Sequence, residues 1–147
     1  MKRITVCMAI AAASAAPVGL QAQATAADST AIVATALDYL EGWYEGNADR
    51  MDRALHPDLA KRVVMNTADG KTELQHMGEQ DLVGMTRRRG ERDKVDLRDR
   101  IRILDVFGKA AVVRADADGW VDFLQIARIE GEWVIVNVLW ELHPGGP

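Results

Sequence analysis

The spacing of hydrophobic and polar residues changes along the chain from a helical period to the alternation typical of strands. Apolar residues recur at helical spacing over residues 28–45, and the same period marks shorter segments at 48–55 and 78–89. Two alternating segments, at 59–67 and 72–77, lie between the second and third of these and flank a turn at 68–71. The first two thirds of the chain are therefore predicted to form three helices and one β-hairpin.

The last third of the chain is rich in β-branched and aromatic residues and predicts four strands. They cover residues 100–107, 109–116, 120–130 and 132–142, with turn signals at Gly108, Gly119 and Gly131. Sequential strands joined by tight turns form an antiparallel meander. Helices gathered ahead of strands are typical of an α+β domain, in which the helices cover one face of a curved sheet.

The final predicted hairpin is largely apolar on both faces. A two-residue loop at Glu130 and Gly131 pairs Ile129 with Glu132, and this pair sets the register. One face then carries Asp122, Leu124, Ile126, Arg128, Trp133, Ile135, Asn137 and Leu139. Because the helices can cover only one face, the other is predicted to form a homodimer interface, through Phe123, Val134, Val136, Val138 and Trp140.

The first residues of the chain predict a cleaved export signal. Lys2 and Arg3 precede a short apolar run, Pro17 follows it, and Ala22-Gln23-Ala24 provides small residues where a signal peptidase cuts. We therefore expect a signal peptide at 1–24 and a single domain at 25–147, with an uncleaved anchor as the alternative. The apolar run is too short to cross a bilayer comfortably, so we expect a periplasmic or secreted protein without membrane attachment after cleavage.

Composition and charge argue against several classes of function. The 147 residues include 18 Lys and Arg against 22 Asp and Glu, a net charge of −4, and this acidic balance argues against nucleic-acid binding. Cys7, the single cysteine, lies in the predicted signal peptide, so the mature domain has no thiol for a disulfide or a zinc site. The three histidines are scattered and no phosphate-binding or dinucleotide-binding motif occurs, so we expect no metal and no cofactor.

Three segments carry a resemblance to a known family. They are ALDYLEGWYEGNADRMDRALHPDL at 36–59, RIRILDVFGKAAVVRAD at 100–116 and WVDFLQIARIEGEWVIVNVLWELHP at 120–144. Together they resemble the putative lumazine-binding family of the nuclear transport factor 2-like (ketosteroid isomerase-like) superfamily. The resemblance implies a cystatin-like cone, in which a curved antiparallel sheet wraps around the N-terminal helices and leaves an apolar pocket open at one end. It also implies dimers formed through the outer face of the sheet.

Five residues are candidates for the walls of such a pocket. Asp122 and Asn137 share the mixed face of the final hairpin, and Tyr39 and Trp43 lie four residues apart on the first helix. His56 ends the second helix, where it could contact a ligand or cap the helix. The alternative roles are a strand-start carboxylate for Asp122 and core packing for the two aromatic residues.

Two functions remain open from the sequence. The first is non-catalytic binding of a small apolar or heteroaromatic molecule, because no unmistakable catalytic pair is visible. The second is an enzyme of the isomerase or dehydratase kind, with Asp122 as general base and Tyr39 or His56 as its partner. An accessory module with a vestigial pocket is a third class. Convergence of Asp122 and a second polar group on one ligand atom would distinguish the second function from the first.

Overall fold

One curved six-stranded sheet with helices on a single face makes up residues 24–144, the part of the chain that this computed structural model describes. The predicted signal peptide lies outside the described residues apart from Ala24. The elements are α1 (Ala26–Glu45), α2 (Ala48–Ala54), β1 (Leu55–Asn66), β2 (Thr72–Met77), α3 (Glu79–Arg88), the 3-10 helix η1 (Arg98–Arg100), β3 (Ile101–Phe107), β4 (Ala110–Asp116), β5 (Trp120–Ile129) and β6 (Glu132–Leu142).

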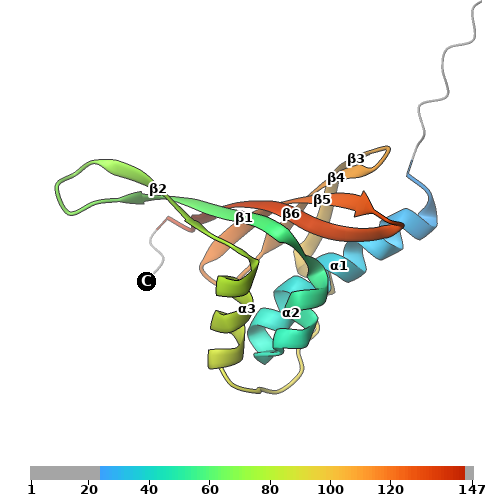
Figure 1. The fold of residues 1–147 in the computed structure, drawn as a ribbon, viewed down its shortest axis with the longest axis horizontal. Helices are drawn as coiled ribbons and strands as arrows, with labels where there is room; N and C mark the ends of the chain where they lie inside the picture. The colour runs from blue at the N-terminus through green and yellow to red at the C-terminus, as the bar shows by residue number, and fades with distance from the viewer. Residues whose placement is uncertain (1–23, 145–147) are drawn as a thin grey trace, which may run out of the picture.

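The strands follow the order β2-β1-β6-β5-β4-β3, and every neighbouring pair is antiparallel except β1 and β6, which run parallel. Figure 1 shows the three helices on one side of this sheet, while the β1–β2 hairpin extends beyond them. The predicted α+β class, with a curved sheet over N-terminal helices, is confirmed. The first strand begins at Leu55, earlier than predicted, because it leaves α2 directly.

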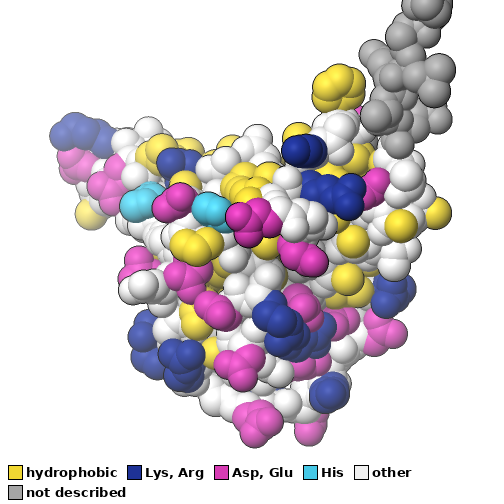
Figure 2. Space-filling model, turned by 45° about the vertical axis from the view of Figure 1, so that its right-hand side comes forward, with side chains coloured by type: hydrophobic (Ala, Val, Ile, Leu, Met, Phe, Trp, Pro, Cys, Tyr) yellow, Lys and Arg dark blue, Asp and Glu magenta, His cyan; other side chains and the backbone are white. Residues whose placement is uncertain are grey.

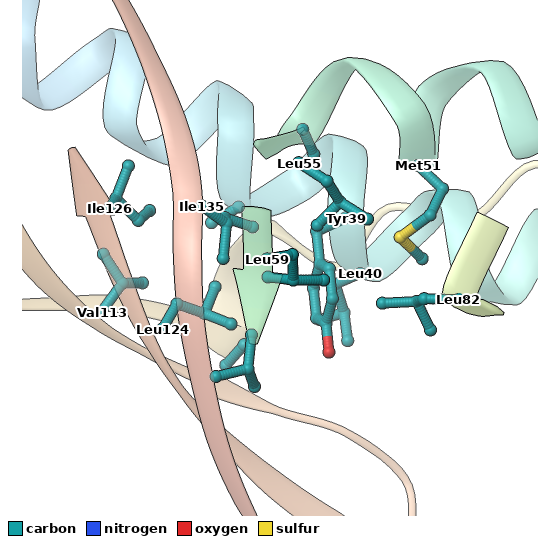
Figure 3. Close-up of a cluster of buried hydrophobic side chains, with 14 of the residues drawn as sticks. Tyr39, Leu40, Met51, Leu55, Leu59, Leu82, Val113, Leu124, Ile126 and Ile135 are labelled. Carbon is teal, nitrogen blue, oxygen red and sulfur yellow. The ribbon is translucent and has the colours of Figure 1, made fainter. Parts of the chain in front are cut away.

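Helix α1 supplies the inner side of the core. Its start is fixed by a capping box, in which Thr25 and Asp28 exchange hydrogen bonds between side chain and backbone. Its buried stripe packs against apolar residues of β3, β4 and β6. Figure 3 shows part of this cluster, including Tyr39, Leu40, Met51, Leu55, Leu59, Leu82, Val113, Leu124, Ile126 and Ile135.

A network of charged side chains ties the irregular segment before β3 to the C-terminal half of α1. The Arg50 guanidinium bridges Asp38, Glu41 and Glu45, at 2.8, 2.6 and 3.0 Å. The same two glutamates accept backbone hydrogen bonds, Glu41 from Leu97 at 3.0 Å and Glu45 from Val95 at 3.3 Å. These bonds give the backbone amides of Val95 and Leu97 partners that no regular element provides.

The last hairpin contains a β-bulge that the sequence pattern does not reveal. The pairs from Ile129–Glu132 to Ile126–Ile135 follow the predicted register, but Gln125 pairs with Asn137, so Val136 has no partner on β5. One extra residue reverses the inward and outward positions of the rest of the strand. The predicted faces are therefore wrong beyond the bulge. The side chains that exchange faces are Asn137, Val138, Leu139 and Trp140.

Candidate functional site

A cavity of about 320 Å³ opens between the sheet and the helices. It is mostly apolar, and its size falls in the range of small-molecule sites. Elements far apart in the chain contribute to it, because α1, β1, β2, α3, the β4–β5 turn, β5 and β6 each supply at least one wall residue. The lining residues are Trp43, Lys61, Met77, Leu82, Met85, Asp118, Gly119, Trp120, Trp140 and Leu142.

Lys61 provides the buried polar group of this cavity. Strand alternation places it between Leu59 and Val63 on the inward face of β1, and its side chain is only 8% exposed. Its Nζ donates a hydrogen bond of 2.6 Å to the hydroxyl of Tyr39 and forms an ion pair with Asp122. The rings of Tyr39 and Trp140 lie 5.4 and 5.1 Å from the same nitrogen, so the cation also contacts two aromatic faces.

Asp122 is completely buried beneath Lys61 and is not part of the cavity wall. Its Oδ1 pairs with Lys61, and its Oδ2 accepts a hydrogen bond of 2.7 Å from Nε1 of Trp120. Both carboxylate oxygens therefore have partners from the protein itself. The arrangement suits an anchor for the lysine better than a base that removes a proton from a ligand.

Burial shifts the pKa values of Lys61 and Tyr39 in opposite directions. It lowers the pKa of Lys61, and the negative charge of Asp122 opposes that shift. Burial raises the pKa of Tyr39 well above its ordinary value, and Asp122 adds to the increase. Tyr39 therefore stays neutral through the physiological range, and Asp122 favours the charged form of Lys61. Figure 3 shows the Tyr39 hydroxyl as the oxygen of an otherwise apolar cluster.

Aromatic residues hold the mouth of the cavity in a fixed arrangement. Trp43 and Trp120 meet edge to face at 6.5 Å, and Tyr44 stacks on Trp120 at 6.3 Å. The Tyr44 hydroxyl accepts a 2.7 Å hydrogen bond from the backbone of Asp118, which positions the β4–β5 turn. Arg89 packs over the ring of Trp43 at 4.3 Å. The tryptophan rings are thus positioned by neighbours that do not depend on a ligand.

Three of the predicted site residues come together and two do not. Trp43 lines the cavity, and Tyr39 and Asp122 hold Lys61 beneath it. Because of the bulge, Asn137 lies instead on the outer face of the sheet. There its Oδ1 accepts a hydrogen bond of 3.4 Å from Arg62. His56 lies at the start of β1, where its Nδ1 accepts a hydrogen bond of 3.1 Å from the Asp58 amide, and it does not line the cavity.

Lys61 is the functional residue that the sequence interpretation missed. The signal that could have found it is a lysine in phase with Leu59 and Val63, on the face of a strand that should be apolar. The sequence predicts Trp120 only as a strand residue and Trp140 as a residue of the dimer interface. They line the cavity because one begins β5 beside the mouth and the other turns inward beyond the bulge.

Neither a metal centre nor a membrane span is found in the part of the chain that the structure describes. Within residues 24–144 no group of three or more His, Cys, Asp or Glu side chains could hold a metal ion. No helix in the same range is long and apolar enough to cross a bilayer.

The fold is that of nuclear transport factor 2-like proteins, as a comparison with solved structures shows. A protein of unknown function from Shewanella baltica has a TM-score of 0.64 and 24% identity, covering 80% of this chain and 95% of its own. One from Methylobacillus flagellatus has a TM-score of 0.64 and 21% identity, covering 86% and 100%. A cystatin-like protein from Nostoc punctiforme has a TM-score of 0.56 and 15% identity, covering 85% and 98%. At these identities the likeness shows the fold alone.

The family follows from the sequence itself. Residues 27–141 match the model of the family described as Putative lumazine-binding, so the chain belongs to that family. The predicted resemblance is thereby confirmed. No curated protein sequence is significantly similar to the chain.

Proposed function

We propose that the protein binds a small, flat, largely apolar aromatic or heteroaromatic molecule in the cavity without converting it. The observation that carries the proposal is a single buried ammonium group, Lys61, at the base of a cavity walled mainly by tryptophan, methionine and leucine. Such a site offers area for an aromatic ring and one directed hydrogen bond. The description of the family, lumazine binding, points to a ligand of the same kind.

The position of Asp122 favours binding over catalysis. A general base must lie within hydrogen-bond reach of the proton that it removes. Asp122 is fully buried, and its two oxygens already accept bonds from Lys61 and Trp120. The carboxylate that does line the cavity in the described chain, Asp118, is paired with Arg100. Asp122 is therefore placed to hold Lys61 and not to take part in a reaction.

Mass spectrometry of small molecules released from the natively purified protein tests the proposal. We expect an aromatic or heteroaromatic compound, and titration with lumazine should quench the cavity tryptophans. Met85→Trp, which fills the cavity, should abolish both signals, whereas Leu104→Trp, at a residue 48% exposed and outside the cavity, should preserve them. Absence of any released compound together with no response to lumazine or other bicyclic aromatic compounds would contradict the proposal.

A second part of the proposal concerns the outer face of the sheet. No helix covers this face in the part of the molecule drawn in Figure 1, and Figure 2 shows hydrophobic side chains gathered at the level of the sheet above a charged helical part. Leu74, Phe123 and Leu139 are 60%, 39% and 54% exposed and line one shallow groove there. Apolar groups in such a groove favour association.

The proposed partner is a second copy of the chain, joined through this groove. A twofold contact is self-complementary, so the same three apolar residues cover one another. The groove also contains Arg62, Gln125 and Asn137, which can form hydrogen bonds across the twofold axis. The residues differ from those predicted, because Val138 is buried in the core and Trp140 faces the cavity, whereas Phe123 stays outside. Val134 and Val136 are half-buried.

Export is the third part of the proposal. The pattern of Lys2, Arg3, the apolar run and Ala22-Gln23-Ala24 supports a cleaved signal peptide. Cleavage after Ala24 would leave Thr25, the capping residue of α1, at the start of the mature domain. N-terminal sequencing of the protein from periplasmic and extracellular fractions tests this, and intact Met1 on cytoplasmic protein would contradict it.

A further inference from the structure

The donor at the base of the cavity is a cation whose charge is already balanced. From this we propose that the cavity selects uncharged ligands that present a carbonyl oxygen or ring nitrogen to Lys61, and rejects carboxylates of the same shape. The proposal rests on the proposed binding function and adds to it the charge and acceptor chemistry of the ligand.

The first support is the inventory of charges around the cavity. Lys61 is its single cationic wall residue in the described part of the chain, and Asp122 lies directly beneath that lysine with no exposure to water. At the mouth, Asp118 is paired with Arg100. Arg89 packs on Trp43 and donates to its backbone oxygen at 2.9 Å, but it is not among the lining residues. The cavity therefore has no cation left over for an anionic ligand.

The second support is the geometry of the ammonium group. An ammonium has three donors, and two of them serve the hydroxyl of Tyr39 and the carboxylate of Asp122. Because Lys61 also lines the cavity, its third donor can bond to a neutral acceptor without disturbing either contact. A carboxylate in that place would lie beside a second anion, Asp122, among apolar walls where repulsion is poorly screened.

The third support is the shape of the walls. Trp43 and Trp120 stand at 88° to each other and both line the cavity, so a flat ligand can meet aromatic surface on two adjoining sides. A bicyclic aromatic compound with one carbonyl group suits a cavity of about 320 Å³. The matched probes are 2-acetonaphthone and 2-naphthoate, which differ in a methyl group and a charged oxygen.

Calorimetric titration of both probes into the wild-type protein tests the selectivity. We expect 2-acetonaphthone to bind at least about tenfold more tightly than 2-naphthoate. Equal or tighter binding of 2-naphthoate overturns the charge selectivity while leaving the binding function intact. Binding of neither probe counts against the proposed binding function itself.

Two variants separate this mechanism from the general reluctance of an ion to enter any apolar cavity. Asp122→Asn leaves the charge of Lys61 without a counter-ion. The ratio of the affinities for 2-acetonaphthone and 2-naphthoate should then fall by about tenfold or more. Lys61→Gln keeps a neutral donor over an unbalanced Asp122, so the preference should increase. The titrations are made at about pH 6, where a buried lysine retains its proton more readily. An unchanged preference in either folded variant overturns the proposal, and if both variants fail to fold, equal or tighter binding of 2-naphthoate to the wild type still overturns it.

Discussion

The indole nitrogen of Trp120 lies 2.7 Å from Oδ2 of Asp122, while the ring of the same tryptophan forms part of the cavity wall. A wall residue therefore holds the carboxylate that in turn holds Lys61. Because the three side chains form one continuous set of contacts, a change in any of them alters both the shape of the cavity and the charge at its base.

The Lys61–Asp122 pair should show strong thermodynamic coupling. Asp122→Leu leaves a buried ammonium unpaired and should lower the free energy of unfolding by about 3–5 kcal/mol. Lys61→Met leaves a buried carboxylate and should cost a similar amount. The double variant replaces both charges and should cost less than the sum of the two single changes, as measured by urea unfolding. Simple additivity would contradict the coupling.

Stability should fall at alkaline pH because of Tyr39. The unfolded chain ionises this residue above about pH 10, whereas burial and Asp122 raise its pKa well beyond that in the folded protein. The folded state then binds more protons than the unfolded state, so the free energy of unfolding decreases as pH rises through this window. Lys61, whose pKa is lowered by burial, contributes the opposite slope.

Tyr39→Phe isolates the alkaline effect. The variant should be less stable near neutral pH by about 1 kcal/mol, since Lys61 loses an acceptor. Its stability should decline less steeply above about pH 10 in a series of urea unfolding curves. Tyr44→Phe is the matched control, because Tyr44 is less enclosed and its pKa is raised less. Parallel curves for the wild type and Tyr39→Phe would refute the prediction.

Gly46 ends α1 in a conformation and a space that only glycine fits. Its φ is +66°, and a Cβ there would lie 1.9 Å from the carbonyl oxygen of Gly90. Gly46→Ala should therefore destabilise the protein by more than about 3 kcal/mol in thermal or urea unfolding. Gly70 has a φ of +79° with nothing near its Cβ position, so Gly70→Ala should cost only the backbone strain, about 1–2 kcal/mol.

The Arg50 network should stabilise the segment before β3. Arg50→Met leaves Glu41 and Glu45 buried without their cation and should cost about 3–5 kcal/mol, with faster amide exchange at Val95 and Leu97. The matched control is Arg53→Met, whose side chain is 59% exposed, and it should cost less than about 1 kcal/mol. Equal effects of the two substitutions would show that the network adds nothing beyond a surface ion pair.

The outer face should govern the oligomeric state. Sedimentation equilibrium should show a dimer for the wild type and a monomer for Leu139→Asp, because the aspartate would be buried at the twofold contact. Phe107→Asp is the control, since Phe107 is 67% exposed at the β3–β4 turn and lies outside the groove. A wild-type monomer, or a Leu139→Asp dimer, would contradict the proposed interface.

Most of the fold could be predicted from periodicity, because the elements follow local rules. The Glu130-Gly131 turn fixes the pair Ile129 and Glu132, as the structure confirms. The first helix ends at Glu45, where the helical spacing of apolar residues predicts its end. The parallel pairing of β1 with β6 joins segments far apart in the chain, and no local pattern specifies such a partner.

The site was less predictable for two physical reasons. A prediction from alternation assumes that each residue of one strand pairs with one residue of the next. Because β6 has an extra residue, that prediction puts Asn137 inside and Trp140 outside, which is wrong for both. A charged residue is normally predicted to lie on the surface, so the pattern does not indicate a buried Lys61. A lysine can be buried when a carboxylate such as Asp122 pairs with it. Asp122 and Trp43 were found because their positions precede or lie far from the bulge.

The unpaired Val136 shifts the alternation of inward and outward side chains along β6 by one residue. Residues 132–135 have the inward and outward positions that the turn predicts, whereas residues 137–142 have the opposite ones. When relatives are aligned through this strand, one that lacks the extra residue needs a gap at this point. Without that gap, the alignment equates residues of the cavity wall with residues of the opposite surface, and conservation scores at Val138 and Trp140 describe the wrong side of the sheet.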